Sequence, residues 1–344
     1  MTNVIVGFFI MKKITDFERY HRNQLRAQKR FARYLSQRHT HGAFGKIHLF
    51  RPVEEPVIPV SAPRIFSLME NPEEVLSFIA ALSARARRDR PLFIDLMNVE
   101  RISPEAVLLL LSTIKSRRLK KCLRIGGNEP RDPEVSAALS QSGFYSYVTH
   151  KPKGHRSDST TGIMKKHEGK KVREDICAQL VQHATKAIYG KVTKNGGLYR
   201  ALIECMANTR DHASVEGKEQ EAWWVSVHCN AEAKTADFAF LDNGVGIFKS
   251  IKWQNFTKRI AKSIFFTDQS SLLNDLLHAH LGSRTELPYR GKGLPAILKA
   301  QQRGQITNLR LITNKAYLDA TSGVGRVIKQ EFKGTCLTWR IQCE

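Results

Sequence analysis

The sequence predicts an α/β domain followed by an α+β domain, and three observations predict this order. Between residues 47 and 150, short apolar runs alternate with amphipathic helical patterns. After residue 173, two helical patterns precede several runs rich in β-branched and aromatic residues. Residues 151–173 between them are polar, basic and without apolar periodicity, which is typical of a linker. A chain of 344 residues is long enough for two such cores.

The elements of the first domain follow from its alternating pattern, which implies a mixed or parallel sheet with helices against it. The predicted elements are a helix over Pro72–Arg87, a strand over Pro91–Leu96, a helix over Pro104–Arg118, a strand over Cys122–Gly127 and a helix over Asp132–Gly143.

The second domain, residues 174–344, is predicted as helices on one face of a mixed, mainly antiparallel sheet. The predicted helices are Glu174–Tyr189, the segment around Leu202–Ala213 and one after the glycine turn at 290–293. The predicted strands are Ala222–Cys229, Thr235–Asp242, Gln305–Thr313, Gly325–Phe332 and Thr335–Ile341.

The chain carries a formal net charge of +23, although its 42% hydrophobic and 25% charged residues are ordinary for a globular protein. Such a charge attracts nucleic acid, anionic membrane surfaces or acidic proteins, and it says nothing about the fold. A basic arm, residues 1–46, contains a predicted helix over residues 13–38. This arm and the linker are either a nucleic-acid or partner site or simply a solvated basic surface.

Six cysteines without a CxxC pair or metal-ligand spacing favour a reduced, cytoplasmic compartment. The apolar run at residues 4–11 is too short to span a bilayer and lacks the features of a signal peptide. We therefore expect a cytoplasmic protein without a membrane span.

Three polar side chains share one stripe of an otherwise apolar predicted helix. Glu204, Asn208 and His212 are spaced four residues apart and therefore point into the same space. A buried carboxylate and amide are costly without partners, so a ligand is expected there. His212 is either a phosphate contact or a helix histidine satisfied by its own surroundings.

Three glycine-containing motifs follow this helix in order. Glycine lets a backbone approach a ligand closely, and a helix N-terminus favours phosphate. The motifs are Asp242-Asn243-Gly244-Val245-Gly246, Arg290-Gly291-Lys292-Gly293 and Gly334-Thr335.

In this combination and order, residues 174–344 resemble the GHKL ATP-binding superfamily of gyrase, heat-shock protein 90, histidine kinases and MutL. Glu204 and Asn208 match its E-x-x-x-N box, and Asp242, Gly244 and Gly246 match its D-x-G-x-G motif. The resemblance implies a Bergerat-fold sandwich that binds ATP and Mg²⁺. Gly291 and Gly293 would form the second glycine box, and Gly334-Thr335 the closing G-T.

The resemblance also implies a role for each site residue. Asn208 would hold Mg²⁺ against the triphosphate, Asp242 would accept from the adenine amine, and Glu204 would activate water. Gly244 and Gly246 would admit the nucleotide close to the backbone, and Thr335 would support the adenine. The segment from Arg290 to Gly293, with Lys292 placed there by position alone, would cradle the phosphates.

The first domain resembles the STAS domain of anti-anti-sigma factors over residues 92–111, a buried strand, a short loop and a helix start. The family has D-S-S-G there, with a phosphorylated serine, whereas this chain has Ser103-Pro104-Glu105-Ala106. Glu105 stands at the acceptor position, which argues against a phosphorylation switch. The STAS-like domain would then serve as an interaction module for a protein partner.

The sequence thus predicts a GHKL-type ATPase that acts as a nucleotide-dependent regulatory switch, in prokaryotic signalling or phage defence, as a monomer or homodimer. One alternative is a protein kinase of the histidine or anti-sigma serine type. The other is a nucleotide-gated nucleic-acid-binding module that does not hydrolyse ATP. No H-E/D phosphoacceptor box precedes the ATP-binding segment, which disfavours a histidine kinase.

Overall fold

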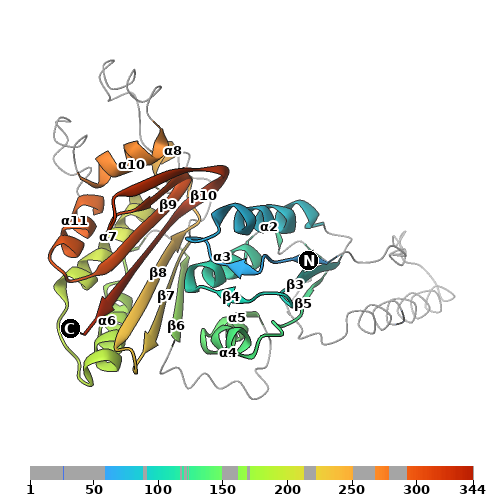
Figure 1. Ribbon diagram of the computed structural model, residues 1–344, viewed down its shortest axis with the longest axis horizontal. Coiled ribbons are helices and arrows are strands. Elements are labelled where there is room, and N and C mark those ends of the chain that lie inside the picture. The colour runs from blue at the N-terminus through green and yellow to red at the C-terminus, as the bar shows by residue number, and fades with distance from the viewer. Residues whose placement is uncertain are drawn as a thin grey trace, which may run out of the picture.

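The fold is taken from a computed structural model, which is described for part of the chain (Figure 1). Only the backbone course is described at 162–168, 211–212 and 222. Of the predicted basic arm, only Arg26 is described, in a helix and exposed; the rest of the arm lies outside the described residues. The described residues are 26, 59–87, 91–116, 118–119, 122, 124–148, 162–168, 171–212, 222–250, 268–278 and 293–343.

Residues 59–148, here called the N-terminal unit, form parallel strands with helices, as predicted. The strands β1 (Val60–Ser61), β3 (Pro91–Asp95) and β5 (Arg124–Gly127) lie parallel in the order β1-β3-β5, and β2 (Ile65–Phe66) pairs with β4 (Arg101–Ile102). The helices are α2 (Pro72–Arg85), α3 (Pro104–Ile114), α4 (Pro133–Gln141) and the unpredicted α5 (Phe144–Val148). The three predicted helices each begin at a proline, whose fixed φ suits the first helical turn.

Residues 162–343, here called the C-terminal unit, form one five-stranded sheet with helices. The order is β6-β7-β8-β10-β9, and every pair is antiparallel. The strands are β6 (Gly162–Glu168), β7 (Ala222–Asn230), β8 (Thr235–Asp242), β9 (Thr307–Asp319) and β10 (Val324–Gln342). The helices are α6 (Glu174–Tyr189), α7 (Gly196–His212), α8 (Ile247–Ser250), α10 (Gln269–Leu277) and α11 (Gly293–Gln302).

Three predictions about this sheet were wrong. The described sheet is antiparallel rather than mixed, because short turns join β7 to β8 and β9 to β10. The segment predicted as a linker, 151–173, contains edge strand β6, whose basic residues hid the strand pattern. The two strands predicted at the end of the chain are one long strand, β10, interrupted by register shifts against β9.

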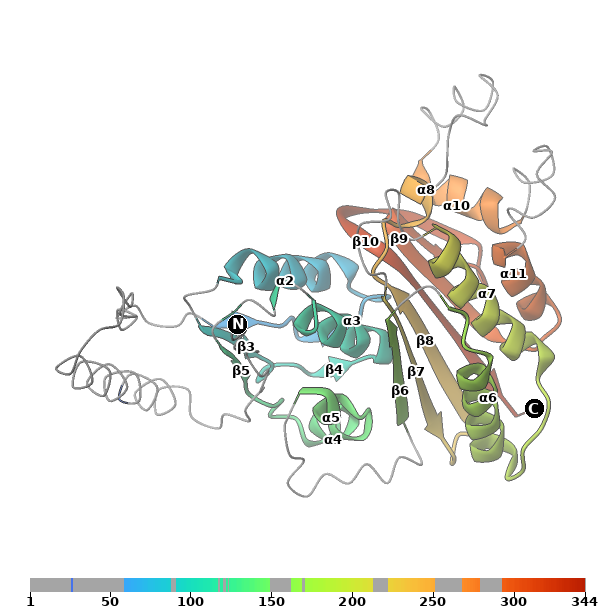
Figure 2. The same ribbon diagram turned by 180° about the vertical axis from the view of Figure 1, so that it is seen from behind.

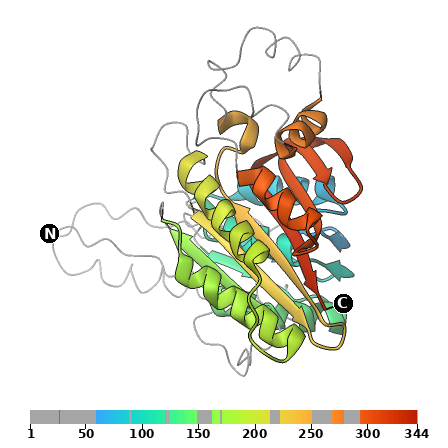
Figure 3. The same ribbon diagram turned by 90° about the vertical axis from the view of Figure 1, so that its left-hand side faces the viewer.

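The described helices of the C-terminal unit lie on one face of the sheet, as predicted, and the N-terminal unit covers the other face. The inner face packs against α6, α7 and α11, while the outer face packs against α3 of the N-terminal unit (Figures 1 and 2). Figure 3 shows α6, α7 and α11 together in front of the sheet. Neighbouring Trp223 and Trp224 point into different cores, which is why apolar residues follow one another in the first half of β7 instead of alternating with polar ones.

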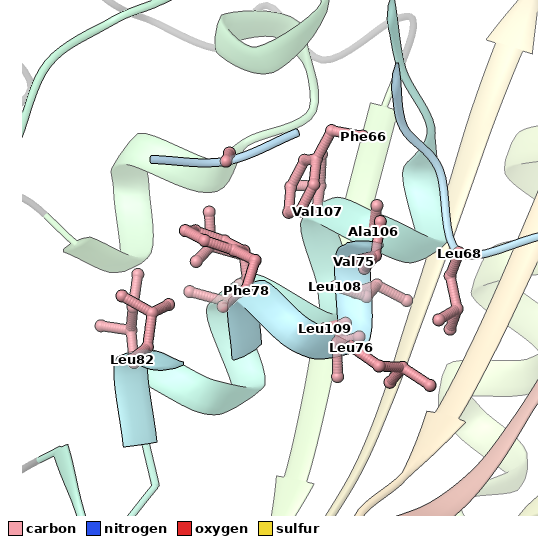
Figure 4. Packing of buried hydrophobic residues seen from close by; sticks show 14 of the residues in the cluster. Phe66, Leu68, Val75, Leu76, Phe78, Leu82, Ala106, Val107, Leu108 and Leu109 are labelled. Carbon is pink, nitrogen blue, oxygen red and sulfur yellow. The ribbon is translucent and has the colours of Figure 1, made fainter. Parts of the chain in front are cut away.

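The N-terminal unit and the outer face of the sheet share one hydrophobic core. This core joins α2 and α3 to outer-face residues of the sheet, among them Trp224, Leu241 and Ile312. Figure 4 shows the α2 and α3 side chains at its centre, Phe78 and Leu108 among them. Every residue of α3 after Pro104 is buried, so this helix has no solvent-exposed face there. Packing therefore joins the two units as closely as it joins the layers within each.

No helix among the described residues has the length and apolar character that crossing a membrane requires. All six cysteines are free, and Cys177, Cys205, Cys229 and Cys336 are buried. They behave there as small apolar side chains.

Candidate functional site

The polar stripe lies on α7, at the edge of the inner core. The apolar side of this helix, with Leu202, Cys205 and Met206, is buried against the sheet. Glu204 and Asn208 are half-buried, and the Glu204 side chain is 19% exposed. Arg200, one turn earlier, places a guanidinium nitrogen 3.2 Å from the Glu204 carboxylate. His212 is the last residue of α7, and its side chain lies outside the described part of the structure.

Gly293, the last residue of the second glycine motif, lies directly against this stripe. A Cβ built on Gly293 would be 2.9 Å from Oδ1 of Asn208 and 3.2 Å from Oε2 of Glu204. Gly293 is the first residue of α11, whose leading N–H groups lack partners within the helix. The fold thus places a carboxylate and an amide beside a helix N-terminus. The rest of this motif, Arg290 to Lys292, lies outside the described residues.

Asp242 ends β8 and turns the chain into the first glycine motif. Its side chain is 7% exposed, and its Oδ1 accepts a hydrogen bond from the N–H of Gly244 at 2.8 Å. Gly246 has a φ of +84°, a conformation that glycine adopts without the strain of a side chain. The motif is therefore a tight turn stabilised by its own carboxylate.

The Gly334-Thr335 motif lies beside Asp242, on the neighbouring strand of the sheet. Thr335 pairs with Asp242 in the register of β10 and β8. A Cβ on Gly334 would be 2.1 Å from the carbonyl oxygen of Asp242, so no other residue fits at this position without a shift. Thr335 is 7% exposed. The predicted pair of motifs is thus brought together.

Two residues of β9, Thr313 and Asn314, hold the Asp242–Gly246 turn and were not predicted. Oγ1 of Thr313 accepts from the N–H of Ile247 at 2.9 Å and donates to the carbonyl of Gly334 at 3.0 Å. Oδ1 of Asn314 accepts from the N–H of Phe248 at 3.1 Å. No local signal in the sequence indicates this pair, because Thr313 is the last residue of the predicted strand and Asn314 is the next residue of the chain.

The amide of Asn314 also fixes the opposite side of the same turn. Its Nδ2 donates to the carbonyl oxygen of Val245 at 2.9 Å. A Cβ on Gly246 would be 2.5 Å from Oδ1 of Asn314, so the turn and this amide are in close contact. Asn314 itself has a φ of +50°, which asparagine tolerates better than most residues.

Cys205 lies on the apolar side of α7. Burial is the main cause that raises the pKa of this thiol well above its usual value, and the carboxylates of Asp242 and Glu204 add to it. Within the described residues, no cluster of three or more His, Cys, Asp or Glu side chains is arranged to bind a metal ion. The oxygen of Asn208 is suited to a hard cation such as Mg²⁺ that keeps most of its water ligands.

A separate cleft of about 340 Å³ lies on the other side of the sheet, between the start of α3 and the outer face. Its walls include Glu105, Arg310 and Arg340, and none of the predicted nucleotide residues lines it. Arg340 is engaged by Asp237 through two hydrogen bonds, at 2.7 and 3.0 Å.

The candidate site is thus defined by α7, the start of α11, the Asp242–Gly246 turn and strands β9 and β10, and residues 251–267 and 279–292 lie outside the described residues. Four of the predicted residues, Glu204, Asn208, Asp242 and Thr335, are placed with described side chains. Compared with known proteins, the chain matches no family model, and no curated protein matches it.

Proposed function

We propose that the C-terminal unit binds Mg-ATP in a GHKL-like, Bergerat-type site and that the whole protein is a nucleotide-dependent regulatory switch. The observation that carries this proposal is the close approach of Gly293 to Asn208 and Glu204, where an added Cβ would lie 2.9 Å from Oδ1 of Asn208 and 3.2 Å from Oε2 of Glu204. Residues that are distant in the sequence, and that the resemblance assigns to one triphosphate, are therefore neighbours in the fold. Asp242 also pairs with Thr335, and these are the two residues that the resemblance assigns to the adenine.

Each placed residue has the chemistry that its role requires. Asn208 supplies an amide oxygen for Mg²⁺, and the N-terminus of α11 supplies N–H groups for phosphate oxygens. Asp242 is the buried acceptor for the exocyclic amine of adenine. Glu204 orients or deprotonates the attacking water, and Arg200 holds its carboxylate in place.

The N-terminal unit supports a STAS-like interaction module. Ser103, Pro104 and Glu105 occupy the start of α3, as the resemblance requires of the acceptor loop. Glu105 accepts hydrogen bonds from the hydroxyls of Ser67 and Ser103 and is 5% exposed. A buried, hydrogen-bonded glutamate at this position favours a permanent contact over a phosphorylation switch.

The nucleotide assignment is tested by equilibrium titration with a fluorescent ATP analogue and Mg²⁺. Asp242→Asn should weaken binding at least tenfold, because a charged acceptor of a buried hydrogen bond is lost. Asp237→Asn is the matched control on the same strand, because Asp237 faces Arg340 on the outer side. Equal affinities for folded Asp242→Asn and wild type would remove the assignment.

The fate of the γ-phosphate separates the three functional alternatives. Incubation with γ-labelled ATP gives free phosphate for an ATPase, labelled protein for a kinase, and neither for a nucleotide-gated binding module. For an ATPase, Glu204→Gln should retain ATP binding and lose hydrolysis, whereas Asn208→Ala should weaken the Mg²⁺-dependent binding itself. Wild-type turnover in Glu204→Gln would show that this carboxylate is not the base.

A further inference from the structure

Strand β10 contains a bulge at which the N-terminal unit contacts the backbone of the C-terminal unit. The register between β10 and β9 shifts between Val327 and Phe332 and again before Thr335. The carboxylate of Glu73, in the first turn of α2, accepts from the N–H of Lys329 at 2.7 Å and from that of Gln330 at 3.3 Å. A side chain of the other unit therefore satisfies the donors that the bulge exposes.

A second contact holds the strand just before the bulge. The guanidinium of Arg326 donates to the carbonyl oxygen of Met69 at 3.0 Å and lies 4.5 Å from the ring centre of Tyr317. Met69 and Glu73 flank the start of α2. The start of α2 is thus connected to β10 at two points.

Glu331, the residue after this contact, connects the bulge to the nucleotide turn. Its carboxylate accepts from Nζ of Lys249 at 2.6 Å and from Nδ2 of Asn314 at 3.3 Å. The hydrogen bond from Lys249 is the main cause that lowers the pKa of Glu331. Lys249 lies on α8, directly after the turn, and Asn314 holds both sides of that turn.

We propose that Asn314 is a positioning residue for the nucleotide turn and that the N-terminal unit controls it through Glu73 and the β10 bulge. This regulation rests on the proposed function, because it names the device that sets the affinity of the same site. When α2 holds the bulge, Glu331 orients the Asn314 amide and the turn presents Asp242. When the contact between Glu73 and the bulge is lost, the bulge relaxes and ATP affinity falls.

Thermodynamic linkage makes this coupling reciprocal: bound ATP strengthens the contact between α2 and β10 by the same factor. The turn has little room to accommodate a shift, because Gly246 and Gly334 are both packed against neighbouring atoms. A displacement of Asn314 therefore moves the Asp242 turn instead of being absorbed by empty space.

The first test measures ATP affinity of full-length variants. Glu73→Ala should lower the affinity about fivefold or more, within the usual range of coupling between sites. Glu73→Gln should recover part of it, since its amide oxygen still accepts from an N–H. The matched control is Glu74→Ala, which makes the same charge change at the exposed neighbour. If the wild type binds ATP and all variants bind it equally, the proposed regulation is wrong.

The second test needs no nucleotide and therefore separates the two proposals. In hydrogen–deuterium exchange of the free protein, Glu73→Ala should speed exchange at Lys329 and Gln330 and also, about fivefold or more, at Ile247 and Phe248. Glu74→Ala should leave all four amides protected. Faster exchange at Lys329 and Gln330 alone would mean that Glu73 holds only the bulge, and it would overturn the proposed coupling to the turn. Faster exchange at the turn in a protein that does not bind ATP would refute the proposed function and keep the coupling.

Discussion

The two faces of the five-stranded sheet are equally buried, but they are covered by helices of different character. On the inner face, α7 has an apolar side against the sheet and a polar stripe with Glu204 and Asn208. On the outer face, α3 is buried on all sides, with Glu105 at its start as its charged group. The polar stripe of α7 is part of the proposed nucleotide site, whereas α3 contributes its whole surface to the core that joins the two units.

The largest effect is expected from removing the N-terminal unit, which covers the outer face of the sheet. Deletion of residues 1–150 exposes outer-face apolar residues of the sheet, including Trp224, Leu241 and Ile312. An apolar patch of this kind promotes association, so the remaining chain should be insoluble or aggregated. Size-exclusion chromatography and soluble yield measure this.

Deletion of residues 1–46 alone is the control, because it keeps the described residues that cover the outer face. A monodisperse, folded C-terminal unit would contradict the role given to the outer face.

Single truncations in the two cores should destabilise the same cooperative transition. Leu108 on α3 and Leu202 on α7 are both fully buried, at 0% exposure. Each change to alanine should cost about 2–5 kcal/mol through lost burial and the cavity that remains. Denaturant unfolding followed by far-UV circular dichroism and tryptophan fluorescence measures both.

Coincident transitions by the two probes are expected for wild type and for both variants. Two separate transitions, each shifted by only one of the substitutions, would mean that the faces belong to independent folding units.

A smaller effect should distinguish two glycines of similar backbone conformation. Gly246→Ala adds a methyl group against Asn314, whereas Gly190, with a φ of +70°, has no atom within 4 Å of an added Cβ. Gly246→Ala should therefore destabilise by about 3 kcal/mol and weaken ATP binding, whereas Gly190→Ala should cost about 1 kcal/mol. Thermal unfolding and nucleotide titration compare them, and equal costs would show that the turn is not tightly held.

The smallest effect concerns pH at the outer face. Burial raises the pKa of Glu105 in the folded state, so the native protein holds this proton more tightly than the unfolded chain does. The stabilisation that this group contributes is therefore fully present at pH values below the ordinary glutamate pKa, and it is lost as the pH rises through the raised pKa of the folded state. The loss is at most about 1.4 kcal/mol per pH unit.

Glu105→Gln should remove this part of the pH dependence, and urea unfolding at a series of pH values measures it. Glu74→Gln, at an exposed position on α2, is the control. A Glu105→Gln profile parallel to that of wild type would mean that the carboxyl does not titrate as a buried group.

The sequence predicts best where local pattern and backbone constraint coincide. Helix starts at Pro72 and Pro104 were correct, the predicted start at Asp132 is the N-cap of α4, and the end of β8 at Asp242 was correct. Glycine spacing also led to Gly293, which the fold brings to the predicted stripe. Such features depend on a few neighbouring residues and can be found from the chain alone.

What could not be predicted depends on contacts between distant segments. Asn314 donates a hydrogen bond to the carbonyl oxygen of Val245, which lies 69 residues earlier in the chain. No local sequence pattern indicates such a contact. Strand β6 owes its structure to pairing with β7, not to its own basic residues. The burial of the outer face under α3 was not predicted, because it depends on packing between the two units.

The interior position of β10, the last strand of the chain to be made, affects how the sheet forms during biosynthesis. This strand lies between β8 and β9, so the sheet is incomplete until residue 342 has left the ribosome. Helix α3, complete at residue 114, is made long before that, and its apolar residues pack against the outer face of the sheet in the native fold. At about 5–20 residues per second, the delay is on the order of 10 to 50 seconds. During this interval the apolar residues of α3 lack the complete sheet that covers them in the native protein.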